Sequence, residues 1–502
     1  MTIYKNFRWG FSGEPQEMAV ENGRVARRGR PSDDGDESAE TVDLGGRFLL
    51  PAFIDAHCHI LPTGLDLKKL SLAECQTPEA VLDAVRDRAR ELSDGGWLLA
   101  VLYDQTKFST GRHLTRDDLD HVCPERPALL RHVSGHASVA NSAALEAARI
   151  ADDVPDPRGG SFVRDASGRL TGVLLETAHD LVSSSAPRPS LDGMADAILL
   201  AGEKMSALGV SCAADMMTGH FDLETELEAY RLAEARGCPI RVRLYPIWSA
   251  VFGANGIGKD RLESIASGFP PERLRIAGIK LFADGAIGAC TAAIYGRFTP
   301  SGPTQNGEED VDGQLIYPPE ELKRRVRVAS DAGYQVAIHS IGDHSTDLVM
   351  DAVEATGDPS RHRIEHAMLL SDAQIERLAG LGCHVTMQPE FLMRLGGGYR
   401  RNLGEERAAR LKRFRSVWDA GIVLSLNSDR PVVAGDPWDG IRTAASRPEG
   451  FEPAENLTLS EAILGYTARA AEATNDGETM GSLAEGQLAD FRVYDYDPLA
   501  RR

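Results

Sequence analysis

The feature of this 502-residue chain that most restricts its fold is an alternation of strand-like and helix-like segments. Short apolar segments alternate with longer ones whose apolar residues recur every third or fourth position. Strands separated by helices pair in parallel through right-handed crossovers. Eight such strands predict an α/β fold, a closed (β/α)8 TIM-type barrel. The predicted strands are residues 53–59, 209–216, 240–247, 275–285, 334–343, 362–368, 383–389 and 421–429.

The predicted helices between these strands include one over residues 371–382, where Ser371 or Asp372 would cap the first turn. The others are residues 194–208, 224–237, 319–333 and 345–357. The Gly-rich segment LGGGYR at 395–400 is expected to be a flexible loop over the active site. No G-x-G-x-x-G follows an early strand, which disfavours a dinucleotide-binding dehydrogenase.

The two chain ends are rich in short strands and turns, including a hairpin signal at Asn22-Gly23. We expect residues 1–50 and 475–502 to form one small β-sandwich domain together. Residues 51–474 would form the barrel. A large insertion at 61–193, between the first two barrel strands, has strand-like pieces of its own and is expected to cover the barrel mouth.

The amino-acid composition limits the kinds of molecule that the protein is expected to bind. The net charge is -20 and no run of Lys and Arg is present, which argues against nucleic acid and anionic membrane surfaces. The seven cysteines form no C-x-x-C motif, which favours a reducing cytoplasm. The chain starts with no stretch typical of a signal peptide, and no segment approaches the ~20 apolar residues of a membrane span. We expect a small-molecule substrate, and a homo-oligomer is left open.

The segment FIDAHCHI at 53–60 ends in two histidines one residue apart. Alternate residues of a strand point the same way, so His57 and His59 would face the barrel interior while Cys58 points away. Two imidazoles on one face can hold one divalent ion. They can equally be two polar residues at a strand end, and the motif alone does not decide.

Other polar residues stand at the ends of later strands, where a barrel of this type places its chemistry. His339 and His366 follow apolar runs, whereas His362 begins its strand and is expected at the opposite end of the barrel. Four histidines at matching ends predict a divalent metal site, with zinc or a first-row relative as the ion. The four are His57, His59, His339 and His366.

Two more strand-end residues have alternative explanations. Lys280 would either pair with an acid such as Asp284 or, as a neutral amine, react with carbon dioxide to give a carbamate that bridges two metals. Asp429 would either form a turn before Pro431 or shuttle a proton between water and a leaving group.

Six motifs in order resemble the metal-dependent amidohydrolase superfamily, in its N-substituted formamide deformylase-like (YtcJ-type) branch. They are FIDAHCHI, IKLFADG, AIHSIGD, HRIEHA, LNSDRPV and GSLAEGQLADFRVYD. The resemblance implies metal binding by His57, His59, His339 and His366, a carbamylated Lys280 and a catalytic Asp429. It also implies that His136 and Glu176 reach the substrate from the insertion. Whether Lys280 or Glu176 bridges the metals is left open.

The resemblance implies a metal-dependent hydrolase of carbon–nitrogen bonds other than peptide bonds. The expected reaction is attack of metal-activated hydroxide on an amide, an N-substituted formamide or a cyclic amide, with one or two ions per site. Two alternatives are a deaminase of ring amines on the same scaffold and a non-catalytic metal-binding or regulatory relative.

Overall fold

The computed structural model describes residues 1–30, 39–92, 96–133, 135, 137–157, 160–299 and 313–500. The chain divides into two compact units. One consists of Met1–Leu61 with Ala201–Arg502, and the other is Pro62–Leu200.

Parallel strands form the centre of the first unit. One sheet has the order β15-β14-β13-β6, another has the order β16-β17-β18-β19-β20, and every neighbouring pair in both is parallel. Each predicted barrel strand therefore overlaps an observed strand, and the predicted strand 275–285 overlaps two, β15 and β16. Their bounds are β6 Phe53–Cys58, β13 Val210–Thr218, β14 Arg241–Pro246, β15 Leu274–Ile276, β16 Gly278–Phe282, β17 Gln335–Ser340, β18 Arg363–His366, β19 His384–Met387 and β20 Leu424–Leu426.

Backbone contacts link the two sheets at both edges. Only Ala277 separates β15 from β16, and its N–H donates to the carbonyl of Leu244 in β14 at 2.9 Å. At the other edge, the N–H of Asp429, just after β20, donates to the carbonyl of His57 in β6 at 2.8 Å. The N–H of His59 donates in turn to the carbonyl of Arg430 at 2.8 Å. The predicted α/β class is confirmed.

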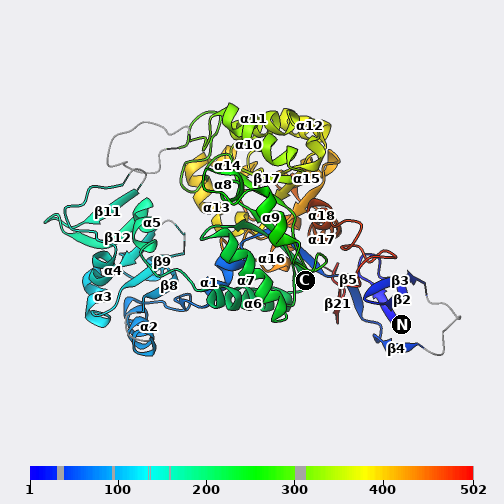
Figure 1. The fold of residues 1–502 in the computed structure, drawn as a ribbon, viewed down its shortest axis with the longest axis horizontal. Coiled ribbons are helices and arrows are strands. Elements are labelled where there is room, and N and C mark those ends of the chain that lie inside the picture. The colour runs from blue at the N-terminus through cyan, green and yellow to red at the C-terminus, as the bar shows by residue number, and fades with distance from the viewer. Residues whose placement is uncertain are drawn as a thin grey trace. The chain divides into compact units, whose positions relative to one another are not determined.

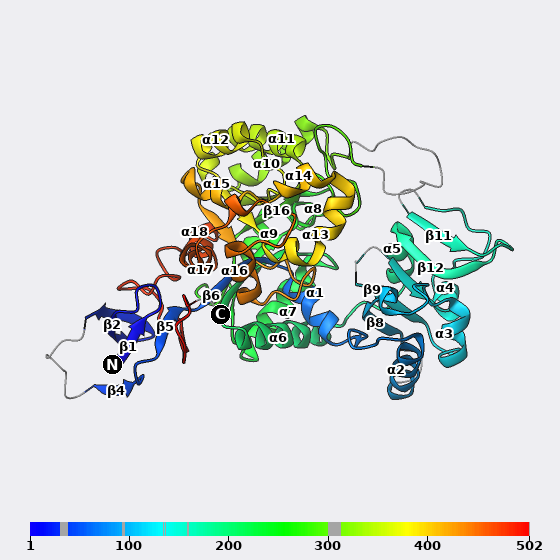
Figure 2. The same ribbon diagram turned by 180° about the vertical axis from the view of Figure 1, so that it is seen from behind.

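Helices pack around these strands, and α10, α11 and α12 lie side by side (Figure 2). The predicted cap of α12 is present: Ser371 Oγ accepts from the N–H of Gln374, whose side chain accepts from the N–H of Ser371. The helix ends at Gly382 with φ 68°. The helices of this unit are α6 Leu191–Ala207 (which begins in the other unit), α7 Leu223–Ala235, α8 Trp248–Phe252, α9 Lys259–Ala266, α10 Pro319–Asp331, α11 Asp343–Glu354, α12 Asp372–Leu381, α14 Glu405–Ala409, α15 Phe414–Asp419, α16 Pro437–Ala445, α17 Leu459–Gly465 and α18 Ala468–Ala473.

The expected loop at 395–400 is wrong: these residues lie inside helix α13, Glu390–Leu403. Each glycine in a helix interior costs about 1 kcal/mol relative to alanine, so propensity argued for a loop. Tertiary packing overrides that preference. A Cβ on Gly396 would lie 2.7 Å from the ring of Phe451, so the helix needs a glycine there to approach its neighbour.

A six-stranded sheet joins the two chain ends (Figure 1). Its order is β21-β5-β1-β2-β3, with β4 paired to β1, and β21 runs antiparallel to β5. The predicted hairpin at Asn22-Gly23 connects β2 to β3, and both residues have positive φ, 50° and 74°. The strands are β1 Thr2–Trp9, β2 Pro15–Glu21, β3 Arg24–Gly29, β4 Glu40–Asp43, β5 Phe48–Pro51 and β21 Phe491–Tyr494.

The unit Pro62–Leu200 has its own sheet, in the order β11-β12-β10-β9-β8-β7, and its own buried apolar clusters. Helices α2, α3 and α4 gather along this sheet (Figure 2). The elements are β7 Leu70–Ser71, α2 Pro78–Glu91, β8 Leu98–Tyr103, α3 Arg116–Val122, β9 Ala128–His132, β10 Ala137–Ala140, α4 Ser142–Ala147, β11 Gly160–Arg164, β12 Leu170–Glu176 and α5 Thr177–Ser183, preceded by α1 Ile60–Leu67.

None of the helices in the described residues has the length and apolar composition needed to span a bilayer.

Candidate metal centre

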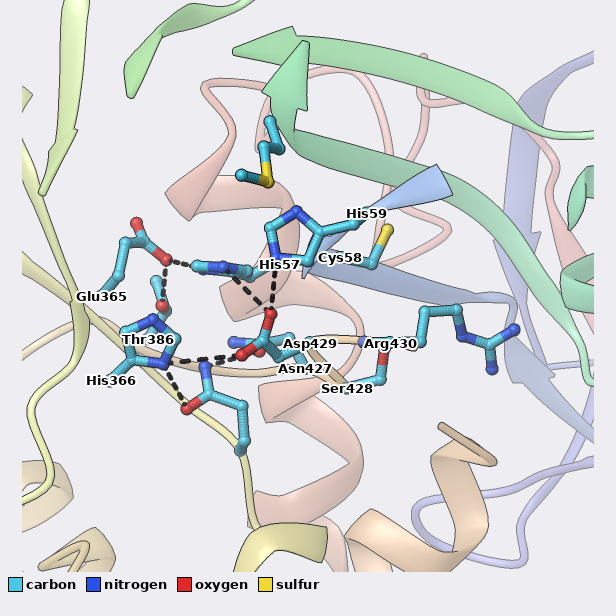
Figure 3. A network of polar contacts seen from close by, with 12 residues as sticks. His57, Cys58, His59, Glu365, His366, Thr386, Asn427, Ser428, Asp429 and Arg430 are labelled. Atoms are coloured by element: carbon cyan, nitrogen blue, oxygen red, sulfur yellow. Dashed lines mark hydrogen bonds and ion pairs between the residues drawn. The ribbon is translucent and has the colours of Figure 1, made fainter. Parts of the chain in front are cut away.

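Histidines from three strand ends converge in the first unit, and Figure 3 shows those at the ends of β6 and β18. The ring centroids of His57 and His366 are 4.8 Å apart, and those of His339 and His366 are 4.5 Å apart. The ring of His59 lies 5.7 Å from that of His57. The structure therefore brings together all four histidines singled out from the sequence.

Asp429 faces these imidazoles. Its Oδ1 lies 2.9 Å from Nε2 of His59 and 3.5 Å from Nε2 of His57, and its Oδ2 lies 3.9 Å from Nδ1 of His366. His57, His366 and Asp429 each offer one ligand atom within 4.8 Å of the others. Imidazole nitrogens and a carboxylate oxygen at this spacing are a donor set that fits one divalent ion.

One nitrogen of each of three rings is held by a hydrogen-bond acceptor. Nδ1 of His57 lies 2.5 Å from Oε2 of Glu365, Nε2 of His339 lies 2.9 Å from the carbonyl of Gly285, and Nδ1 of His366 lies 2.9 Å from Oε1 of Gln388. The nitrogen facing an acceptor carries the proton, so the other nitrogen keeps its lone pair. Such outer partners orient metal-binding histidines in proteins.

Burial keeps these imidazoles neutral. It lowers the pKa of His57 to about 4, and the nearby ammonium of Lys280 adds to that effect. Burial also lowers the pKa of His339 and, more strongly, that of His366. Neutral imidazole is the form that binds metal ions, so the site is ready to bind at neutral pH.

Asp429 remains ionised in the same environment. Burial alone would raise its pKa, but His57, His59 and Lys280 outweigh that penalty, and the pKa lies below the usual value of an aspartate. Hydrogen bonds hold the loop that carries Asp429. Ser428 donates its N–H and its hydroxyl to the two carboxylate oxygens of Asp55. Asp55 thus holds the residue next to Asp429 in place.

Lys280 lies in β16 and is 1% exposed. Within the described part of the chain, its Nζ has no hydrogen-bond partner. The predicted alternative, an ion pair with Asp284, is wrong, because Asp284 instead accepts from the backbone of Ile341 and Gly342. Burial lowers the pKa of Lys280 to about 8, so its neutral amine is accessible near neutral pH.

Glu365 is a buried partner of the site that no sequence motif pointed out. It accepts from Nε and Nη2 of Arg363 and from Oγ1 of Thr386, besides its contact with His57. Burial would raise the pKa of Glu365, but Arg363 and His57 outweigh burial, and the pKa lies well below the usual value. The available signal was a pair of opposite charges, Arg363 and Glu365, on the same face of an apolar strand.

Cys58 takes no part in the cluster. Its thiol donates to the carbonyl of Ala214 at 3.4 Å, and Figure 3 shows the side chain directed away from Asp429. The prediction that the middle residue of H-C-H points away is confirmed. No disulfide joins cysteines within the described residues.

The two predicted substrate contacts belong to the other unit. His136 lies outside the described residues. Glu176 ends β12 with a φ of 52°, and its role stays a prediction.

Imidazoles and a carboxylate at the carboxyl ends of parallel strands define a metal-dependent hydrolase site. The profile of the amidohydrolase family matches residues 40–502. YtcJ of Bacillus subtilis (strain 168) is 31% identical over 477 residues, 93% of this chain and 87% of that protein. N-substituted formamide deformylase of Arthrobacter pascens is 31% identical over 510 residues, 96% of this chain and 90% of that enzyme.

Among solved structures, a metal-dependent hydrolase from Pyrococcus horikoshii OT3 superposes with a TM-score of 0.81 at 27% identity, covering 100% of this chain and 98% of that one. The chain therefore belongs to the amidohydrolase family. It is a metal-dependent hydrolase that acts on carbon–nitrogen bonds other than peptide bonds, as the sequence motifs predicted.

Proposed function

We propose that this enzyme hydrolyses the C–N bond of an amide, an N-substituted formamide or a cyclic amide. The observation that carries the proposal is the convergence of imidazoles from several strand ends on the carboxylate of Asp429. The Arthrobacter pascens relative, named for deformylation of N-substituted formamides, supports this substrate class. We also propose that the two parallel sheets close into a barrel of eight strands, with β15 and β16 counted as one, because backbone contacts link both edges.

Each residue of the site has a proposed role. His57, His59, His339 and His366 hold one or two divalent ions, with zinc as the expected metal, because neutral imidazole suits it. When bound, the ion supplies Lewis acidity, which polarises a carbonyl and makes water acidic enough to react near neutral pH. Asp429 accepts a proton from the attacking water and delivers it to the leaving nitrogen.

Lys280 is proposed as the bridging residue between two ions. Its neutral amine attacks carbon dioxide, forms an N–C bond and loses a proton, giving a carbamate. The buried Nζ without a hydrogen-bond partner in the described residues is the observation that supports this step. The seven cysteines form no C-x-x-C motif, and we propose a reducing location, the cytoplasm.

The test is metal analysis of the pure protein followed by a screen of N-formyl, N-acyl and cyclic amides with and without chelator. We expect bound divalent metal and turnover that chelator abolishes and added zinc restores. Turnover that survives complete metal removal would refute the proposed function.

Mass spectrometry and metal counting test the bridge. Lys280→Ala is expected to lower the metal content from two ions per chain toward one and to remove most of the activity. Unchanged metal content and turnover in this variant would leave the bridging role to another residue such as Glu176.

A further inference from the structure

A run of three polar side chains leads away from His366. Oε1 of Gln388 lies 2.9 Å from Nδ1 of His366 and also 2.9 Å from Nζ of Lys412. Nε2 of Gln388 donates to Oδ1 of Asn427 at 2.8 Å. The side chains of Gln388, Lys412 and Asn427 all belong to fully buried residues, with 0% exposure. Water therefore does not compete for these contacts.

The Gln388 amide has two ends of similar shape but opposite hydrogen-bonding character. If its NH2 group faced His366, Nδ1 would have to accept, and the ring proton would move to Nε2. His366 is neutral in either tautomer, but only the form with the proton on Nδ1 has a lone pair on Nε2. The orientation of one amide therefore decides which nitrogen of His366 can bind a metal ion.

Lys412 removes this ambiguity. Burial lowers the pKa of Lys412 to about 7, so the ammonium form prevails below that pH. An ammonium has three donors and no acceptor, so in that form the amide atom at 2.9 Å from Nζ must be oxygen. That same oxygen contacts Nδ1 of His366. We propose that Lys412 is a positioning residue: it fixes the orientation of the Gln388 amide, and this orientation fixes the tautomer of His366.

The cost of burying Lys412 supports a role beyond packing. Its Nζ lies 5.2 Å from the centre of the Phe391 ring, and the charge of Asp429 only partly offsets the effect of burial on its pKa. Desolvating an ammonium is costly, and an apolar side chain of similar length would fill the same space without that cost. The amide oxygen of Gln388 is the contact that the lysine gains in return.

A first test needs no variant. The inference rests on the proposed function only in taking His366 as a metal ligand. In full-length protein stripped of metal, labelled with 15N at the histidine rings and kept at pH 6, where Lys412 is protonated, long-range 1H–15N correlations report which nitrogen carries the proton. The His366 signals are assigned by their absence in His366→Asn. We expect the proton on Nδ1; a proton on Nε2 of His366 overturns the inference.

A second test uses Lys412→Met, which keeps a long side chain but no donor. We expect a mixture of His366 tautomers and about 10–100-fold weaker Zn²⁺ binding, measured by competition with a chromophoric chelator. An unchanged tautomer and a Zn²⁺ affinity within twofold of the original overturn the inference. A wild-type chain that binds no Zn²⁺ would instead refute the proposed function, while the tautomer measurement would still stand.

The double variant Lys412→Met/Gln388→Glu separates positioning from simple support of the fold. An ionised glutamate has acceptor oxygens only, so it holds the proton of His366 on Nδ1 without help from Lys412. Asn427 can turn its Nδ2 toward the new carboxylate, because that atom has no hydrogen-bond partner among the described residues. We expect the double variant to recover the single tautomer. Failure of this recovery in a folded double variant overturns the inference.

Discussion

His362 directly precedes strand β18 and His366 ends it, and both are buried. Burial lowers the pKa of both, that of His362 to about 4. At the amino end, Nδ1 of His362 accepts from the N–H of Val336 at 3.1 Å. At the carboxyl end, His366 lies among the rings of His57 and His339 and faces Asp429.

A depressed pKa is therefore not what distinguishes a metal-binding histidine in this protein. His362 contacts backbone, whereas His366 contacts other proposed metal ligands from neighbouring strands. His366 differs from His362 because it stands at the carboxyl ends of the parallel strands, where side chains from several strands come together. Backbone strain follows the same division, because His366 and Asp429 adopt positive φ values of 73° and 55°. Strained conformations of this kind concentrate at functional sites.

The largest expected effect comes from the carboxylate at the centre of the carboxyl-end cluster. Asp429→Asn keeps the shape but cannot accept a proton, so we expect kcat to fall by about 10³-fold. Steady-state kinetics on the best amide substrate and metal analysis of the same sample test this. A kcat within tenfold of the original would show that Asp429 is not the proton shuttle.

A matched pair of variants tests the two ends of β18 directly. His366→Asn is expected to lose metal affinity and turnover by more than the roughly 10–100-fold typical of an outer partner. His362→Asn keeps an acceptor near the position of Nδ1 and is expected to retain metal and activity, with a stability loss of about 1–2 kcal/mol. Equal loss of metal in both variants would contradict the division between the two ends.

The next effect concerns the partner behind His57. Glu365→Gln is expected to weaken Zn²⁺ binding by about 10–100-fold, because the amide no longer supplies a charged acceptor for Nδ1. Glu226→Gln is the matched control. Glu226 is also buried, but its oxygens accept from the backbone of Gly219 and Phe221. Competition titrations that place both variants at the same Zn²⁺ affinity would argue against the Glu365 role.

The smallest effect is a change in acid stability. The pKa of His362 falls from 6.5 to about 4 on folding, because burial disfavours the charged ring. This neutral histidine contributes stability above pH 6.5 that is lost as the pH falls toward 4. Chemical denaturation of the metal-free protein across this range should show a shallower pH dependence in His362→Asn. An identical slope in both proteins would mean that the ring stays solvated in the folded state.

Much of the site could be predicted from sequence because its pattern is local. The strand period places His57 and His59 on one face, and the position of a residue at the start or end of an apolar run separated His362 from His366. The buried partners were harder. Gln388 and Lys412 come to His366 from segments distant in sequence, so no spacing signals them. For Glu365 the signal was its pairing with Arg363 on one strand face.

The loop predicted from the glycines at 395–400 was wrong for a related reason. Three consecutive glycines favour a loop in isolation, yet Gly396 lies in α13 because the helix must pass close to Phe451. Local preferences of about 1 kcal/mol per residue yield to such packing.

The sequence by itself determined the alternation of strands and helices, the end of each strand at which a histidine stands, and the family to which the motifs belong. Only the tertiary structure decided which nitrogen of each imidazole is free, that Lys280 pairs with no carboxylate among the described residues, and which side chains lie behind the cluster. The physical reason is the distance along the chain over which each property is decided. Strand periodicity is set by neighbouring residues, whereas tautomer, burial and pKa depend on atoms that only the folded chain brings within a few ångströms.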